Sequence, residues 1–127
     1  MNPIICDTNI FIKLFSSNTT VIAELAKIGN SRILMPSITV MELYIGMSNK
    51  AELQQMKKKI KHFNIVHLNE AASQKSVELI AEYRLSQGIR IPDALIGAMA
   101  VTYDLELFTY NTKDFHFIPD INLYPLP

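Results

Sequence analysis

Short apolar runs that alternate with helix-like segments constrain the fold of this 127-residue chain more than any other feature. The runs cover residues 4–6, 32–35, 65–68 and 105–109, and a weaker fifth run covers 121–124. In the segments between the first four runs, apolar residues recur at the spacing of a helix that buries one face. Parallel strands are short, apolar and joined by helices, so the pattern predicts an α/β fold. We expect a central, largely parallel sheet of four or five strands, flanked by helices.

The chain is expected to form a single domain over residues 1–127, because it contains no repeat, low-complexity segment or linker. Its hydrophobic fraction of 49% is high enough for a sizeable core, which excludes a disordered chain. Twelve basic residues balance twelve acidic ones. Any attraction to nucleic acid must therefore come from a local patch rather than from the net charge.

Features of export or membrane insertion are missing from the sequence. The longest uncharged apolar segments, such as 94–103, are too short to cross a bilayer, and no basic region precedes an apolar stretch at the N-terminus. The lone Cys6 lies in an apolar run and is expected to be a small buried residue, while the lack of paired cysteines favours a reducing compartment. We therefore expect a soluble, cytoplasmic protein with no membrane contact.

Isolated acids interrupt the apolar segments. Asp7 follows the first run and is the only charge among the first twelve residues. Glu42 is the only charge between positions 33 and 49, Asp93 is the only charge between positions 91 and 103, and Asp114 follows the fourth run. Taken singly, each acid has an ordinary explanation: Asp7 as a helix cap or loop acid, Glu42 on a stripe that faces water, Asp93 as a helix-dipole partner, and Asp114 as a surface or turn acid.

Taken together, the four acids favour a metal site. A carboxylate inside an apolar segment is costly unless its charge is compensated, and we expect no ion pair between Glu42 or Asp93 and a Lys or Arg at helical spacing. The carboxyl ends of parallel strands form a ligand crevice, where converging carboxylates repel one another and a divalent cation removes the conflict. Hard oxygen ligands suit Mg²⁺ or Mn²⁺, and the three histidines lack the spacing of zinc ligands. Several neutral polar residues are placed either to orient a cation, water or substrate or to cap helices and turns: Thr8, Asn9, Thr109, Asn111 and Thr112.

Four stretches resemble the PIN-domain family, and most of all the VapC-type toxins of bacterial and archaeal toxin–antitoxin pairs: ICDTNIFI, SITVMELYIGM, IRIPDALIGAMA and LELFTYNTKDF. They occur in the family's order, and the resemblance covers essentially the whole chain. It implies a Mg²⁺- or Mn²⁺-dependent ribonuclease that hydrolyses RNA phosphodiester bonds. It also implies a homodimer held inactive by a cognate antitoxin, which often inserts a segment near the acids. The resemblance places Asp7, Glu42, Asp93 and Asp114 in the catalytic, metal-binding quartet, with Thr8 and Asn111 at polar positions near it.

Two positions depart from the family pattern. Tyr110 stands where the family often has Arg, a change that affects substrate contacts and leaves the metal ligands intact. Gly97 stands where Ala is common.

A lysine-rich segment offers a local patch for RNA. Lys57, Lys58 and Lys61, together with Lys50 and Lys59, are expected on the helix face opposite an apolar stripe of Leu53, Met56, Ile60 and Phe63. These lysines either bind phosphates, with an affinity that falls steeply with salt, or form a solvated helix face. The stripe itself is expected to pack in the core, although part of it suits a dimer or antitoxin surface.

Three other functions are compatible with parts of the pattern. The same nuclease chemistry also serves RNA processing outside toxin–antitoxin biology, and a degenerate PIN fold serves as an interaction module. A receiver-like phosphoacceptor domain needs an Asp after the third apolar run, where Asn69 and Glu70 stand instead. It also leaves Glu42 and Asp93 unexplained, so the nuclease is the favoured interpretation.

Overall fold

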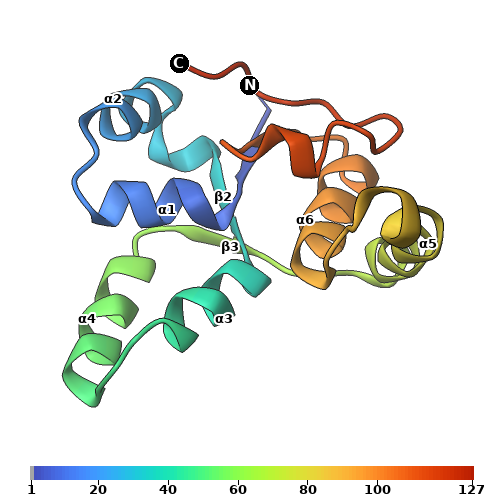
Figure 1. Cartoon of the computed structure of the whole chain (residues 1–127). Coiled ribbons are helices and arrows are strands. Elements are labelled where there is room, and N and C mark those ends of the chain that lie inside the picture. Colours follow the sequence, from blue (N-terminus) through green and yellow to red (C-terminus); the bar gives the residue numbers. More distant parts are fainter. Residues whose placement is uncertain (1) are drawn as a thin grey trace.

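The structure, a computed structural model, describes residues 2–127 and contains a four-stranded parallel sheet (Figure 1). The strands are β1 (Ile4–Cys6), β2 (Ile33–Pro36), β3 (Asn64–Val66) and β4 (Glu106–Phe108), in the spatial order β3-β2-β1-β4. All three pairings are parallel. The predicted α/β class is therefore confirmed, with four strands. The fifth apolar run contributes only a single bridge, between Leu123 and Leu107 beside β4.

Six α-helices surround the sheet: α1 (Thr8–Phe15), α2 (Thr19–Ile28), α3 (Ser37–Ile45), α4 (Lys50–Ile60), α5 (Glu70–Gln87) and α6 (Ile91–Thr102). Short 3₁₀ turns lie at η1 (Asn30–Arg32) and η2 (Thr112–Asp114). Asparagine caps begin three of the helices, since Asn18, Asn49 and Asn69 each accept a hydrogen bond from the backbone N–H three residues on, at 2.8–3.0 Å. Gly88 ends α5 in the left-handed conformation, at φ 67°.

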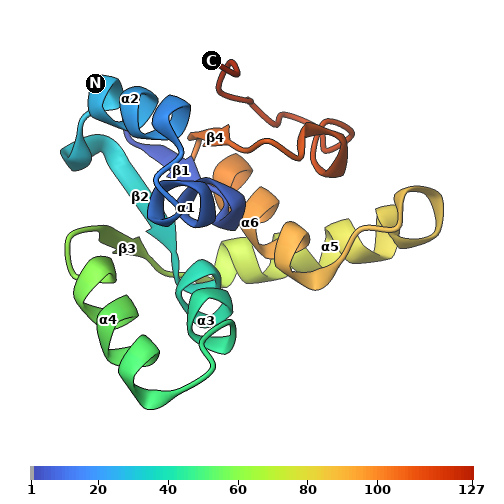
Figure 2. The same ribbon diagram turned by 60° about the vertical axis from the view of Figure 1, so that its left-hand side comes forward.

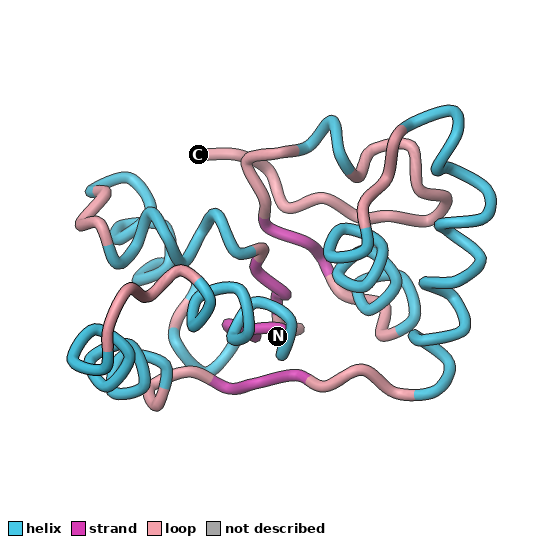
Figure 3. The backbone as a smooth tube through the Cα atoms, turned by 60° about the horizontal axis from the view of Figure 1, so that its bottom comes forward, coloured by secondary structure: helices cyan, strands magenta, loops and turns pink. Residues whose placement is uncertain are grey.

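The sheet separates two hydrophobic cores. Ile4 and Cys6 of β1 point into one core with α1, α2 and α4, and Ile5 between them points into the other with α5 and α6. The two groups of helices lie on opposite sides of the strands (Figures 2 and 3). Cys6 is fully buried, as predicted. Within residues 2–127, no helix combines the length and the apolar character that a membrane crossing requires.

Parallel pairing brings the carboxyl ends of all four strands to one edge of the sheet. In the register, Cys6 pairs with Phe108 and Pro36 pairs with Val66. Helix α1 leaves this edge directly after β1, and α3 leaves it directly after β2. Side chains that follow β1, β2 and β4 therefore lie along one edge of the sheet, the edge at which open parallel sheets bind their ligands.

Candidate active site

Asp7 lies at the end of β1 and is 6% exposed. Its Oδ1 accepts a hydrogen bond from the Thr8 N–H at 2.7 Å, so Asp7 caps α1. Its Oδ2 accepts from the Asn9 amide at 3.0 Å and from the Thr109 hydroxyl at 2.9 Å. The capping role considered for this acid is therefore present, but it occupies one oxygen only. The second oxygen is held by polar groups from α1 and from the end of β4.

Glu42 lies in the middle of α3, the helix that follows β2 at the same edge of the sheet. The Thr8 hydroxyl donates to Glu42 Oε1 at 2.7 Å and is 2.9 Å from the Thr39 hydroxyl. Because a hydroxyl has a single hydrogen, Thr8 accepts from Thr39 while it donates to Glu42. Thr39 is fully buried, whereas the apolar Met41 is 54% exposed. The polar stripe of α3 thus faces the protein at Thr39, is half-buried at Glu42 and reaches water at Gly46, so the alternative of a water-facing stripe holds only at its end.

Asp93 lies in the first turn of α6 and is 7% exposed. Burial raises the pKa of its carboxyl to about 6, and the charges of Asp7 and Asp114 also raise it, against a lowering by the nearby Arg90. The Arg90 Nε lies 3.5 Å from Asp93 Oδ2. The expectation that no Lys or Arg pairs with Asp93 at helical spacing was therefore wrong. Arg90 precedes the helix at its N-cap, three residues before Asp93, which is close enough for contact.

Asp114 and Asn111 belong to the turn that follows β4. Asp114 is half-buried in η2, and its N–H donates to the Asn111 carbonyl at 2.9 Å. Asn111 is exposed, and its backbone N–H donates to the Thr109 hydroxyl at 3.0 Å. Thr109 therefore links this turn to Asp7, because the same hydroxyl donates to the Asp7 carboxylate.

The carboxylates influence one another electrostatically. Burial is the main cause that raises the pKa of Asp7, and the charges of Glu42 and Asp114 raise it further. Hydrogen bonds from Thr109 and Thr8 oppose the rise in this pKa. Asp7 and Asp114 likewise raise the pKa of Asp93, so each of the four predicted acids lies near enough to at least one other to act on its ionisation or to be affected by it.

The site has the donor chemistry of a hard cation, but its side chains do not form a finished ligand cluster. Four carboxylates with few compensating cations suit Mg²⁺ or Mn²⁺, whose preferred ligands are oxygens. Within residues 2–127, no three His, Cys, Asp or Glu side chains are grouped closely enough to hold a metal ion. The residue types therefore fit the cation, and ligation requires the carboxylates to turn toward a common point.

Two residues of the site were missed by sequence reasoning. Thr39 supports Glu42 through Thr8, and its signal was its position three residues before Glu42 on the same helix face. Arg90 was missed because it lies just outside the apolar helix that carries Asp93. Asn9 and Thr109 donate hydrogen bonds to Asp7, a role that neither of the two alternatives for them named, and their action on a cation, water or substrate stays a prediction.

The lysines of α4 are exposed and lie away from these hydrogen bonds. Lys57, Lys58 and Lys61 make no ion pair in the described part of the chain, and Lys59 lies 5.3 Å from the centre of the Phe15 ring. The apolar stripe on the opposite face packs as predicted, with Met56 and Ile60 buried. A role of these lysines in binding RNA stays a prediction.

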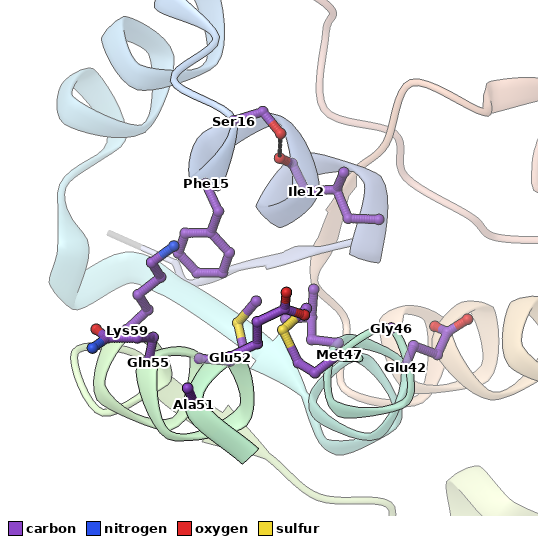
Figure 4. Close-up of a pocket in the computed structure, with 12 residues that line it drawn as sticks. Ile12, Phe15, Ser16, Glu42, Gly46, Met47, Ala51, Glu52, Gln55 and Lys59 are labelled. Carbon is purple, nitrogen blue, oxygen red and sulfur yellow. Dashed lines mark hydrogen bonds between the residues drawn. The ribbon is translucent and has the colours of Figure 1, made fainter. Parts of the chain in front are cut away.

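An apolar groove adjoins Glu42. It lies between α1, α3 and α4 and encloses about 590 Å³ (Figure 4). Its apolar lining includes Ile12, Phe15, Leu43, Met47 and Met56. In Figure 4, Glu42 lies at one end of the groove and Lys59 at the other.

Known proteins with this fold provide an independent comparison. The PIN domain family matches residues 4–119. A toxin–antitoxin complex from Klebsiella pneumoniae is 34% identical, with a TM-score of 0.75 over 92% of this chain and 93% of the other. VapBC-1 from nontypeable Haemophilus influenzae is 26% identical, with a TM-score of 0.77 over 95% and 96% of the two chains. DNA-bound VapBC from Salmonella typhimurium, at 21% identity, has a TM-score of 0.80 over 98% of each chain and shares the fold.

A shorter match joins the chain to a curated protein. The sequence is 36% identical over 53 residues to "Ribonuclease VapC" of Rickettsia bellii (strain RML369-C). That match spans 42% of this chain and 38% of the relative. Since the family match spans nearly all of the sequence and the Klebsiella structure matches it over almost its full length, the chain belongs to the PIN domain family.

Proposed function

We propose that this chain is a Mg²⁺- or Mn²⁺-dependent endoribonuclease that acts as the toxin of a type II toxin–antitoxin pair. The observation that carries the proposal is the buried Asp7, whose pKa is raised by burial and by the charges of two further acids at the same edge of the sheet. Such a group of carboxylates is unfavourable alone and is stabilised by a hard cation. The curated relative named as a ribonuclease supports RNA as the substrate.

Each residue of the site has a defined task in this proposal. Asp7, Glu42, Asp93 and Asp114 would hold the cation, and the chemistry that it supplies is neutralisation of phosphate charge and a lower pKa for water. Thr8 fixes the Glu42 carboxylate, and Asn9 and Thr109 fix the Asp7 carboxylate, through hydrogen bonds of 2.7–3.0 Å. These hydrogen bonds keep the carboxylates in a fixed orientation. Catalysis that depends on holding the reacting groups in the right geometry requires this.

The test is RNA cleavage with and without divalent cations. We expect cleavage in Mg²⁺ or Mn²⁺, none in excess EDTA, and none in Asp7→Asn or Asp93→Asn, with the circular dichroism spectrum unchanged. Asp104→Asn is a matched control, because Asp104 is exposed and has a left-handed φ of 55° that Asn adopts readily. Full activity in EDTA, or in either site variant, would refute the assignment.

A cellular experiment distinguishes the toxin from the alternatives. Expression of the wild type should arrest growth, and expression of Asp7→Asn should not. Cleavage without growth arrest would instead favour an RNA-processing nuclease, and absence of both would favour an inactive interaction module. A short antitoxin-like reading frame beside the gene would support the toxin.

We further propose that the groove between α1, α3 and α4 receives a segment of the antitoxin. The Klebsiella relative was solved as a toxin–antitoxin complex. The groove is mainly apolar, with Glu52 between its ends and Glu42 at one end, so it suits apolar side chains followed by a basic group that reaches the acids. Ile12→Glu should abolish binding of the antitoxin, whereas Ile22→Glu, at an exposed isoleucine of α2 outside this groove, should retain it.

We propose that a second copy of the chain binds to the surface formed by α5 and α6, which we call the α5–α6 face. Val77 and Ile91 are 69% and 67% exposed there, beside a groove of about 460 Å³ with no charged residue in its lining. Glu70, Val77 and Arg84 follow one another at seven-residue spacing, so they share a stripe of α5. Antiparallel pairing of two α5 helices around Val77 therefore places Glu70 of each copy near Arg84 of the other.

Light scattering after size exclusion tests this dimer. The wild type should have twice the chain mass and Val77→Glu the mass of one chain. Leu85→Glu is the matched control, because Leu85 is fully exposed on the same helix but does not line the groove. A monomeric wild type, or a dimeric Val77→Glu, would contradict the assignment of this face.

A further inference from the structure

Lys13 and Tyr110 form a cation–aromatic pair on the rim of the acidic site. The Lys13 ammonium lies 5.0 Å from the centre of the Tyr110 ring. Lys13 is the only basic residue before position 27. It is half-buried, and among residues 2–127 it takes part in no ion pair with a carboxylate. Its ammonium group is therefore held against an aromatic ring, and its charge is not neutralised by an acid.

Hydrogen bonds connect this pair to Asp7. The Tyr110 N–H donates to the Asn9 side-chain oxygen at 3.2 Å, and the Asn9 amide donates to Asp7 Oδ2 at 3.0 Å. Lys13 lies four residues after Asn9 in α1, on the same helix face. One helical turn, about 5.4 Å along the axis, thus separates Lys13 from the residue that holds the Asp7 carboxylate.

The Tyr110 ring acts as a support for the Lys13 side chain. The ring packs against Phe108, with centroids 6.0 Å apart, and also carries the Lys13 ammonium. The ring restricts the Lys13 side chain, which lowers the entropy lost when the ammonium binds an anion.

We propose that Lys13, held by Tyr110, is a positioning residue that binds an RNA phosphate next to the scissile phosphodiester. The inference rests on the proposed ribonuclease function. The acids repel a polyanion, so a cation one turn beyond Asn9, the residue that holds Asp7, attracts the strand without occupying the position of the reacting phosphate. Contact with a phosphate carries no sequence information, so Lys13 supports binding of every RNA sequence equally.

Kinetics and binding at varied salt test this role. In Lys13→Gln, KM for RNA should rise roughly 3- to 10-fold while kcat changes less than about twofold, because the contact is made equally in the ground and transition states. In the cleavage-deficient Asp7→Asn background without metal, the same change should weaken binding measured by fluorescence anisotropy. It should do so to a similar extent for several RNA sequences, and should lower the slope of log affinity against log salt by about 0.7–1.

Three further variants separate positioning from a structural role. Lys13→Arg should restore KM and the salt slope, because Arg keeps both the charge and the aromatic contact. Tyr110→Leu should raise KM by roughly threefold, because it keeps apolar packing and removes the cation–aromatic contact. Lys27→Gln, at an exposed lysine of α2 that pairs with Glu24, is the control and should behave as wild type.

The outcomes distinguish this inference from the function on which it rests. If the wild type cleaves RNA but Lys13→Gln keeps its KM, affinity and salt slope, the role of Lys13 is refuted and the nuclease stands. A loss in kcat alone, or a failure of Lys13→Arg to restore binding, also overturns the role. If the wild type neither binds nor cleaves RNA, the proposed function and this inference are both wrong.

Discussion

Asp93→Asn should make the metal-free protein more stable while it removes activity. The Asp93 carboxyl has its pKa raised from 3.8 to about 6, chiefly by burial. At about 1.4 kcal/mol for each tenfold change in the ionisation constant, the charged carboxylate costs the folded state roughly 3 kcal/mol above pH 7. Asn has nearly the same shape and no charge. Since water at the rim screens part of this cost, we expect the free energy of unfolding to rise by about 1–3 kcal/mol.

The dependence on pH identifies the cause of this gain. Between the ordinary pKa of 3.8 and the folded value of about 6, the folded wild type binds more protons than the unfolded chain. The wild type is therefore most favoured at low pH and loses stability as pH rises through about 6. The advantage of Asp93→Asn should be complete at pH 8, and roughly two thirds of it should be gone at pH 4.5.

Urea and thermal unfolding in EDTA measure both effects. For a chain of this size, a gain of 1 kcal/mol corresponds to roughly 4 °C in Tm. Mg²⁺ should then raise the Tm of the wild type more than that of the variant, because the variant lacks one of the four acids of the proposed cation site. Asp104→Asn should change stability by less than about 0.5 kcal/mol at either pH. An Asp93→Asn protein that is no more stable than the wild type at pH 8, or whose gain is the same at pH 4.5, would refute the reasoning.

Two further predictions concern contacts outside the acidic site. Asn69→Ala removes the side-chain cap that accepts from the Ala72 N–H at 2.8 Å, so it should lower the free energy of urea unfolding by about 1 kcal/mol, and Asn69→Asp should restore most of it. Tyr124→Phe keeps the ring against Phe108 but removes the hydroxyl that donates to Glu24, so it should cost about 1 kcal/mol. Because that hydrogen bond raises the pKa of Tyr124 to about 12, one tyrosine should ionise late in an ultraviolet titration of the wild type and not of the variant. An unchanged titration curve, or an Asn69→Ala protein as stable as the wild type, would contradict these assignments.

Much of the fold follows from local pattern. The four apolar runs correspond to β1–β4, and the asparagine caps at positions 18, 49 and 69 mark helix starts. The fifth run failed to form a strand beyond one bridge, although the Leu107 N–H and carbonyl both bond to its backbone at 2.8 Å. Its bridging residue, Leu123, stands two positions before Pro125, which has no N–H to extend a ladder. Local pattern predicts where a strand can begin, and the neighbouring strand and chain direction decide how far it pairs.

The site was only partly predictable for a related reason. Asp7, Glu42 and Asp93 were visible because each is an isolated charge in an apolar segment. Arg90 and Thr39 were not visible, because their roles depend on contacts at the end of one helix and inside another. The groove beside Glu42 requires α1 to pack near α3 and α4, which come much later in the chain, and the apolar periodicity of a single helix does not predict such packing.

The position of β1 in the middle of the sheet has a consequence for synthesis of the protein. Its outer neighbour β4 begins one hundred residues after it, and Asp7 receives a hydrogen bond from Thr109. A nascent chain therefore lacks half of the pairing for its first strand until the ribosome has translated and released nearly all of this sequence. Pairing across such a long loop is slow to form, so the Asp7 carboxylate gains its final environment among the last events of folding. If the proposed function holds, a cell that makes this protein meets its nuclease activity only after translation of the domain is almost complete.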